Sequence, residues 1–163
     1  MWNRKMMVSG ILVTILAVGQ IVLAVILYNP AGNVSVINLG WGVMMLSAVF
    51  GWLPIYTFRK KGNVQGKGYM HTTTLVDSGV YSIVRHPQYL AGVLLSIALS
   101  LISQHWLVAV LGVCGALFYY QGTYDEEKRC IEKFGDTYIE YMERVPRMNF
   151  VLGIIRCLRD TRA

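Results

Sequence analysis

A short polar run stands at the start of a long apolar stretch. Arg85, His86 and Pro87 are flanked by Tyr81 and Tyr89. Proline suits the first turn of a helix, because its missing N–H would have no partner there. Arginine at the end of an apolar helix is typical of a membrane anchor. Anchoring explains the histidine and the two tyrosines less well, so the run is also a candidate site for chemistry.

A second candidate is the acidic pair Glu126-Glu127, which follows the same apolar stretch. Acidic residues gain nothing from the preference for positive charge at the inner membrane face. They would also lie near the negative end of a helix dipole if the helix stopped there. The alternative is a solvated helix segment in which the pair is balanced by Lys128 and Arg129. On the residues alone, both interpretations stay open.

Aromatic and basic residues surround this pair. The tyrosines and phenylalanine are typical of an interfacial belt, but tyrosines also form cages for sulfonium or ammonium cations. Two arginines further along, by themselves, are typical of lipid headgroup contacts. The aromatic set is Tyr119, Tyr120, Tyr124, Phe134, Tyr138 and Tyr141, and the arginines are Arg144 and Arg147 around Val145-Pro146.

Metal and nucleotide-loop chemistry are not predicted. The three histidines stand at positions 71, 86 and 105, and neither an HExxH nor a CxxC pattern occurs. No P-loop or dinucleotide-binding glycine motif is present. The cysteines Cys114, Cys130 and Cys157 are odd in number and unpaired in spacing, so we expect free thiols.

The elements that must position these residues are apolar helices. Of the 163 residues 55% are hydrophobic, and neither 6–58 nor 87–124 contains Asp, Glu, Lys or Arg. Crossing a bilayer takes about 20 mostly apolar residues. We therefore predict one all-α integral membrane domain over 1–163, a multi-pass helical bundle of about four spans. The spans are 6–28, 37–58, 87–103 and 106–124, and the last two form a tight hairpin.

The basic residues predict how this bundle is oriented. All 15 Lys and Arg residues fall before the first span, between the second and third, or after the fourth. The positive-inside rule then places both termini and the 59–86 loop in the cytosol. The net charge of +6 would face anionic membrane lipids. Nucleic acid is a poor partner, because the charge borders the spans and forms no separate basic module.

The N-terminal run and the tail each predict further structure. Arg4 and Lys5 precede an apolar run that is longer than the ~7–15 residues of a signal peptide core, so we interpret it as a retained span. In the helical cytosolic tail, 125–134 is expected to continue the fourth span. Gly135 would stop that helix, and Asp136 would cap the next one. Residues 148–158 suit an interfacial amphipathic segment.

Small residues predict how the hairpin packs. Gly92, Ser96 and Ser100 recur every four residues in the third span, and Gly112 and Ala116 do so in the fourth. Helices in lipid associate through small residues, which let their backbones approach. We expect the third and fourth spans to pack closely.

Two sequence blocks resemble a known family when taken together. The stretches "LVDSGVYSIVRHPQYLAG" and "EEKRCIEKFGDTYIEYMERVPR" resemble the membrane methyltransferases, a group that includes isoprenylcysteine carboxyl methyltransferases and phospholipid N-methyltransferases. The resemblance covers a catalytic core over 75–147, and the first two spans carry no such signature. The matching positions are Gly79, Tyr81, Arg85, His86, Pro87 and Tyr89, then Glu126, Glu127, Phe134, Gly135, Tyr138, Tyr141, Val145, Pro146 and Arg147.

The resemblance implies S-adenosyl-L-methionine as methyl donor and S-adenosyl-L-homocysteine as product. It also implies a cofactor pocket between the cytosolic end of the hairpin and the tail. An acid would bind the cofactor's ammonium, and Glu127 is preferred over Glu126, with Tyr124 one turn earlier on the same face. The cofactor-binding residues that it implies are Tyr81, His86, Pro87, Tyr89, Leu90, Tyr124, Glu126, Glu127, Tyr138 and Tyr141.

Methyl transfer from a sulfonium is an in-line displacement, so alignment and exclusion of water are the enzyme's main tasks. An acceptor carboxylate is already a nucleophile and needs only a cation such as Arg85 to orient it. An acceptor amine must lose a proton, so a nearby carboxylate would help. Arg85 and Glu127 are therefore the expected catalytic residues, and the acceptor is expected to be a lipid or a prenylated molecule.

The leading hypothesis is an enzyme of the isoprenylcysteine carboxyl methyltransferase type. The alternative is a phosphatidylethanolamine N-methyltransferase, because four spans and a short tail suit the shorter phospholipid enzymes, and prenylcysteine enzymes often have additional N-terminal spans. A non-enzyme alternative is a small four-helix transporter or a structural bundle. Transporters generally place a charged residue inside a span, and the expected spans contain none.

Overall fold

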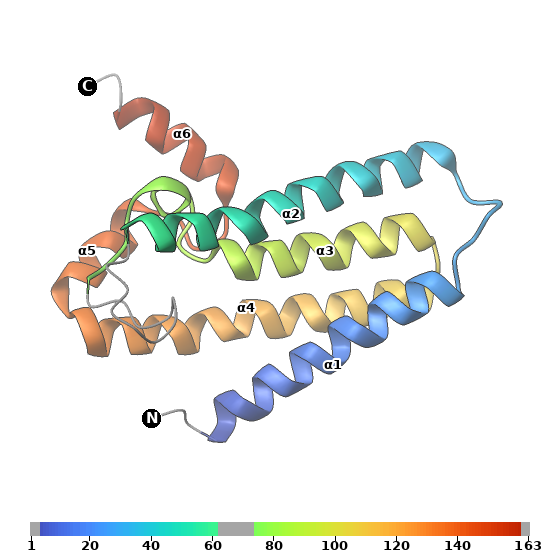
Figure 1. Ribbon diagram of the computed structural model, residues 1–163, viewed down its shortest axis with the longest axis horizontal. Coiled ribbons are helices and arrows are strands. Elements are labelled where there is room, and N and C mark those ends of the chain that lie inside the picture. The colour runs from blue at the N-terminus through green and yellow to red at the C-terminus, as the bar shows by residue number, and fades with distance from the viewer. Residues whose placement is uncertain (1–3, 62–73, 161–163) are drawn as a thin grey trace. The chain divides into compact units, whose positions relative to one another are not determined.

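The computed structural model describes residues 4–61 and 74–160, and within them the chain is helical with no β-strand. The elements are α1 (Arg4–Ile26), α2 (Val34–Lys61), the short 3-10 helix η1 (Gly79–Ser82), α3 (Pro87–Ser103), α4 (Trp106–Phe134), α5 (Asp136–Arg144) and α6 (Phe150–Asp160) (Figure 1). The predicted all-α membrane bundle is confirmed. Lys67 and His71 lie outside the described residues.

Within the described residues, three helices are long and apolar enough to cross a membrane, over Val8–Ile26, Val34–Lys60 and Trp106–Phe134. α3 is apolar but has only 17 residues. At 1.5 Å per residue it would reach about 25 Å, against about 30 Å for a hydrocarbon core. That α3 is a fourth span therefore stays a prediction, as does the cytosolic orientation of the termini. α4 continues without a break through Phe134, as the sequence predicts.

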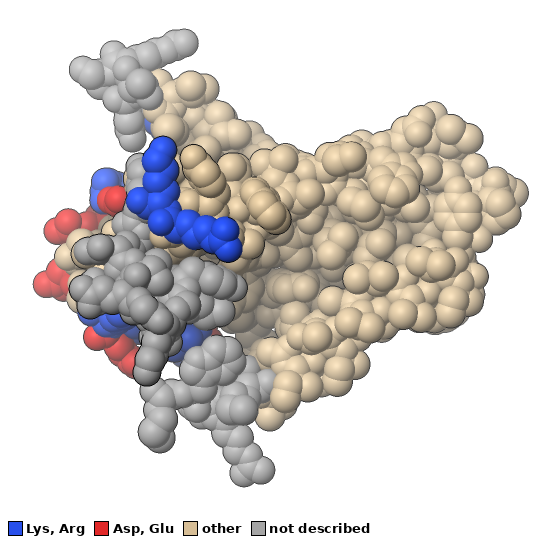
Figure 2. All heavy atoms as spheres, in the orientation of Figure 1, with Lys and Arg blue, Asp and Glu red and all other residues tan. Residues whose placement is uncertain are grey.

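The chain divides into two compact units. The first contains Met1–Val49 and Tyr89–Asp125, and the second contains Phe50–Gln88 and Glu126–Ala163. Among the side chains that the structure describes in the first unit, Asp125 is the one Asp, Glu, Lys or Arg. Figure 2 shows the consequence, since the blue and red atoms gather over the second unit. The candidate chemistry therefore concentrates in the second unit.

In the first unit, a buried glutamine joins α1 to the hairpin of α3 and α4. Gln20 Nε2 donates to the carbonyl of Ser96 at 2.9 Å and to that of Val108 at 3.2 Å. Gly112 makes room for this amide, because a Cβ there would stand 2.6 Å from Gln20 Nε2 and 2.9 Å from Ser100 Oγ. The close packing that the small residues predict is confirmed.

In the second unit, α5 turns back on the end of α4. Gly135 allows this turn with a positive φ of 58°, a conformation that glycine adopts without strain. The predicted cap is corrected by one position: Gly135 occupies the N-cap, and Asp136 is the first helical residue, where its charge still favours the helix dipole. The hydrophobic core here is Tyr138, Tyr141 and Val145, packed against Leu75, Cys130, Ile131, Phe134 and Met142.

Candidate functional site

The segment before α3 is held by the segment after α5. The backbone N–H of Arg85 donates to the carbonyl of Pro146 at 3.0 Å, and that of His86 donates to the carbonyl of Arg147 at 3.2 Å. Proline at 87 begins α3 and proline at 146 follows α5, so both segments are extended next to a helix end. These two bonds bring the two sequence blocks into register with each other.

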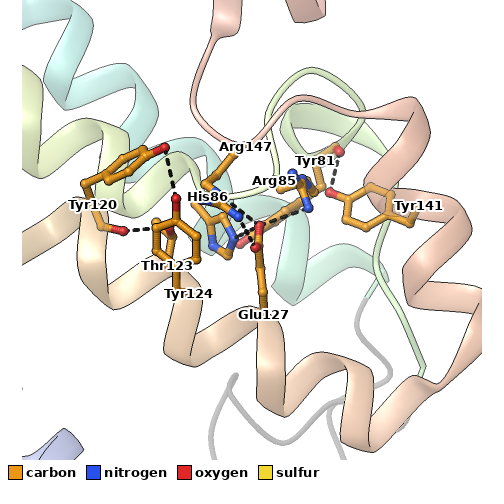
Figure 3. Close-up of polar contacts among 9 residues, drawn as sticks. All are labelled: Tyr81, Arg85, His86, Tyr120, Thr123, Tyr124, Glu127, Tyr141 and Arg147. Atoms are coloured by element: carbon orange, nitrogen blue, oxygen red, sulfur yellow. Dashed lines mark hydrogen bonds and ion pairs between the residues drawn. The ribbon is translucent and has the colours of Figure 1, made fainter.

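Glu127 lies at the centre of the site, on α4. It is only 3% exposed. Arg147 donates to both of its oxygens, from Nε to Oε1 at 3.0 Å and from Nη2 to Oε2 at 2.5 Å. His86 Nε2 lies 3.2 Å from Oε1, with the donor set by the tautomer. Arg85 Nη1 lies 2.9 Å from the same oxygen (Figure 3).

The cluster carries more positive than negative charge. Two guanidiniums, of Arg85 and Arg147, face the single carboxylate of Glu127, which leaves one positive charge in excess. The Arg85 side chain is 8% exposed. A buried charge without a partner is costly. The arrangement therefore suits an additional anionic group beside Arg85.

Arg85 has donors ready for such a group. Within 4–61 and 74–160, neither its Nε nor its Nη1 has a hydrogen-bond partner, although both atoms are buried. The 2.9 Å approach of Nη1 to Glu127 is thus an ion pair without hydrogen-bond geometry. Buried donors almost always have partners. Unpaired guanidinium N–H groups match a carboxylate or phosphate, because arginine binds both through a planar fork.

Tyrosines from two elements support the arginine segment. The Tyr141 hydroxyl, on α5, donates to the Tyr81 carbonyl of η1 at 2.7 Å (Figure 3). The Tyr81 ring packs edge-on against Phe58 at 5.0 Å between centroids. Burial raises the pKa values of the Tyr138 and Tyr141 hydroxyls, so both remain protonated donors. Tyr138 and Tyr141 belong to the core that carries the site.

The predicted site residues divide between the two units. The second unit brings together Tyr81, Arg85, His86, Glu127 and Tyr141 in direct contacts, with Pro87, Glu126 and Tyr138 in the same unit. Tyr89, Leu90 and Tyr124 belong to the first unit. There the Tyr124 hydroxyl donates to that of Tyr120 at 3.4 Å, Leu90 is buried, and Tyr89 occupies the space beside Gly122.

The structure revises one expectation about the tail arginines. Arg144 is exposed and approaches Asp77 at 3.8 Å, as befits a surface residue. Arg147, interpreted from the residues alone as a headgroup contact, instead donates two hydrogen bonds to Glu127. The signal for this role was its place in the second sequence block.

Among the described residues no group of three or more His, Cys, Asp or Glu could hold a metal ion.

Comparison with known proteins identifies the family of the chain. A family model described as phospholipid methyltransferase matches residues 35–137, which is more than half of the chain. The chain belongs to the phospholipid methyltransferase family. The family match contains Arg85, His86, Glu126 and Glu127 and ends just before Tyr138.

Curated relatives of this family member are named Protein-S-isoprenylcysteine O-methyltransferase. The human protein is 38% identical over 88 residues, which are 51% of this chain and 30% of the relative. The mouse protein is 36% identical over the same shares. The Xenopus laevis protein is 35% identical over 83 residues, 50% of this chain and 29% of the relative. The match thus spans less than a third of these relatives. No solved structure gave a significant match.

Proposed function

We propose that the chain transfers a methyl group from S-adenosylmethionine to the carboxylate of a prenylated or otherwise lipidic acceptor at the cytosolic membrane face. The observation that carries this proposal is the buried Arg85, which has unpaired donors and belongs to a cluster with excess positive charge. The names of the curated relatives support a carboxylate acceptor. Membership in a methyltransferase family supports the reaction class.

The residues present fit the proposed cofactor. S-adenosylmethionine supplies an electrophilic methyl group on a sulfonium. The segment with Tyr81, His86 and Pro87 would offer polar and apolar contacts for the cofactor. The partly exposed Arg147 would offer a cation for the cofactor's carboxylate. Both oxygens of Glu127 are already engaged by basic side chains. We therefore assign the cofactor's ammonium to the half-buried neighbour, Glu126.

Arg85 would orient the acceptor in this proposal. Its fork would hold one acceptor oxygen so that the other attacks the methyl carbon in line with the departing sulfur. No base is needed, because a carboxylate is ionised at neutral pH. Glu127 would act by holding Arg85, His86 and Arg147 in place. Tyr89, Leu90, Tyr124, Tyr138 and Tyr141 remain proposed cofactor contacts.

A phospholipid amine acceptor is the second candidate, and the description of the matched family favours it. An ammonium must lose a proton before it attacks a methyl group. Glu127 is poorly suited to take that proton, because two guanidiniums favour its ionised form. The excess positive charge of the cluster also disfavours a cationic acceptor.

Two experiments test the proposal. Titration of S-adenosylhomocysteine into detergent-purified protein should give binding in the micromolar range typical of such sites, about −8 kcal/mol. Absence of binding at millimolar S-adenosylhomocysteine would refute the methyltransferase assignment. Transfer of a radiolabelled methyl group should then favour a farnesylcysteine analogue over phosphatidylethanolamine. The reverse preference would establish the amine alternative.

Arg85→Lys separates the role in the acceptor step from cofactor binding. Lysine keeps the charge but loses the fork, so we expect turnover to fall by about tenfold or more, with S-adenosylhomocysteine affinity changed by less than about threefold. Single-turnover kinetics and the same titration measure both quantities. An unchanged rate would show that Arg85 does not orient the acceptor.

A further inference from the structure

α6 presents three different faces. Phe150, Gly153 and Cys157 lie on one side of the helix and are buried or half-buried. Val151, Ile154, Ile155 and Leu158 follow the spacing of a second side, which we call the apolar stripe, and all four are exposed. Arg156 and Arg159 lie along the remaining edge with Leu152, and all three are exposed. An exposed apolar stripe beside a basic edge is the pattern of a helix that lies on a membrane surface.

The docked side fixes how the helix is turned. The Phe150 ring packs against that of Phe50 on α2, with centroids 5.4 Å apart. Gly153 touches the Ile83 carbonyl so closely that any Cβ would collide with it. Arg156 Nη1 donates to the carbonyls of Glu143 and Arg144 at 3.3 and 3.1 Å, at the end of α5. The exposed stripe is therefore a consequence of specific contacts.

The exposure of the stripe is large for a packed helix. Val151 is 54% exposed and Leu158 is 57% exposed. Single exposed apolar residues are common on protein surfaces, but a continuous apolar strip over two helical turns indicates a partner or a membrane.

Neighbouring residues of α2 indicate the membrane depth of this helix. Trp52, Tyr56 and Lys60 recur every four residues, and Trp52 is 72% exposed. Lys60 Nζ lies 5.9 Å above the Tyr56 ring. Tryptophan, tyrosine and lysine at the end of an apolar span mark the headgroup level. Phe50, which holds Phe150, precedes this marker by half a turn, and α6 departs from this part of α2 (Figure 1).

We propose that α6 is an interfacial helix that lies in the plane of the bilayer surface. Its apolar stripe enters the acyl region, and Arg156 and Arg159 lie among anionic headgroups. The occupant of the stripe is lipid, because α6 packs through Phe150 on α2, a candidate span, and because its basic edge complements anionic lipid. This proposal does not depend on methyl transfer.

Spin labels test the depth of the stripe. Single cysteines are introduced as Val151→Cys, Leu158→Cys and, as a matched control, Glu140→Cys on the exposed side of α5. The background has Cys114, Cys130 and Cys157 replaced by serine, with folding checked by thermal unfolding. The protein is placed in vesicles of phosphatidylcholine and phosphatidylglycerol. Stripe labels should be relaxed by oxygen more than by a water-soluble nickel complex, and the control should show the opposite.

Two outcomes would overturn the proposal. Stripe labels that the nickel complex relaxes as strongly as the control would place α6 in water. Labels shielded from both reagents, with dipolar broadening, would show that a second copy of the chain covers the stripe.

The role of anionic lipid has its own test. Omitting phosphatidylglycerol should reduce the oxygen preference of the stripe labels, and Arg159→Gln should make that preference depend less on phosphatidylglycerol. Equal depth in both vesicles would refute the role of anionic headgroups.

Discussion

Glu127 is one carboxylate that holds two distant segments of the chain. It pairs with Arg85 and His86 before α3 and with Arg147 after α5. A carboxylate used in this way positions basic groups, which remain available to bind anions. Glu126, its neighbour on α4, is half-buried and is the residue we assign to the cofactor's ammonium.

Substitution of these two glutamates should therefore have different effects. Glu127→Gln leaves two guanidiniums close together without a counter-charge, which should lower the free energy of unfolding by about 3 kcal/mol. Glu126→Gln should leave thermal unfolding in detergent nearly unchanged and weaken S-adenosylhomocysteine binding by about tenfold or more. The assignment is reversed if Glu126→Gln binds normally while Glu127→Gln unfolds normally and loses the ligand.

At the scale of elements, α5 is tied to η1 by the Tyr141 hydroxyl. Tyr141→Phe removes that donor, so the Tyr81 carbonyl loses its hydrogen bond from α5, and the free energy of unfolding should fall by about 1–2 kcal/mol.

The raised pKa of the Tyr141 hydroxyl also makes stability depend on pH. Above the unfolded tyrosine pKa of about 10 the unfolded chain loses a proton that the folded chain keeps, so stability falls as pH rises. The fall should be shallower in Tyr141→Phe, and equal slopes would contradict it.

The α3–α4 hairpin offers a matched pair of glycines. A Cβ at Gly112 would stand 2.6 Å from Gln20 Nε2 and 3.1 Å from the Ser96 carbonyl, whereas one at Gly115 would stand 3.6 Å from Ser96 Oγ. Gly112→Ala should thus destabilise the bundle by about 1–3 kcal/mol, and Gly115→Ala should be neutral or better. Unfolding of the two variants in mixed micelles measures the difference. Equal losses would show that Gln20 can move aside.

The elements were largely predictable, but their pairing was not. The charge-free blocks predict the apolar helices, because transfer of apolar residues to lipid depends on local composition. Gly135 predicts the break between α4 and α5, because it acts through its own backbone conformation. Gln20 carries no such local signal, since its partners are backbone carbonyls of other helices. Arg147 resembles any surface arginine until the backbone bonds between 85–86 and 146–147 bring it to Glu127. Long-range pairing of this kind leaves no periodicity in a sequence.

At the scale of the whole molecule, the distribution of charge predicts one orientation in the membrane. All Lys and Arg residues lie in segments that the positive-inside rule places in the cytosol, whereas the 27–33 and 104–105 connections carry none. An active site built on Arg85 and Glu127 would then use cytosolic cofactor. Ala31, in the first connection, and Glu140, on α5, are both exposed and should lie on opposite sides of the membrane.

Cysteine accessibility tests this orientation. In the cysteine-free background, Ala31→Cys should react with a membrane-impermeant maleimide on intact cells. Glu140→Cys should react only after permeabilisation, because the reagent cannot reach the cytosolic face. The reverse pattern would put the site outside, where the proposed cofactor is scarce. Labelling of both positions from one side would mean that the chain crosses the membrane an even number of times between residues 31 and 140. The helix that does not cross would then be α3, whose 17 residues make it the shortest of the expected spans.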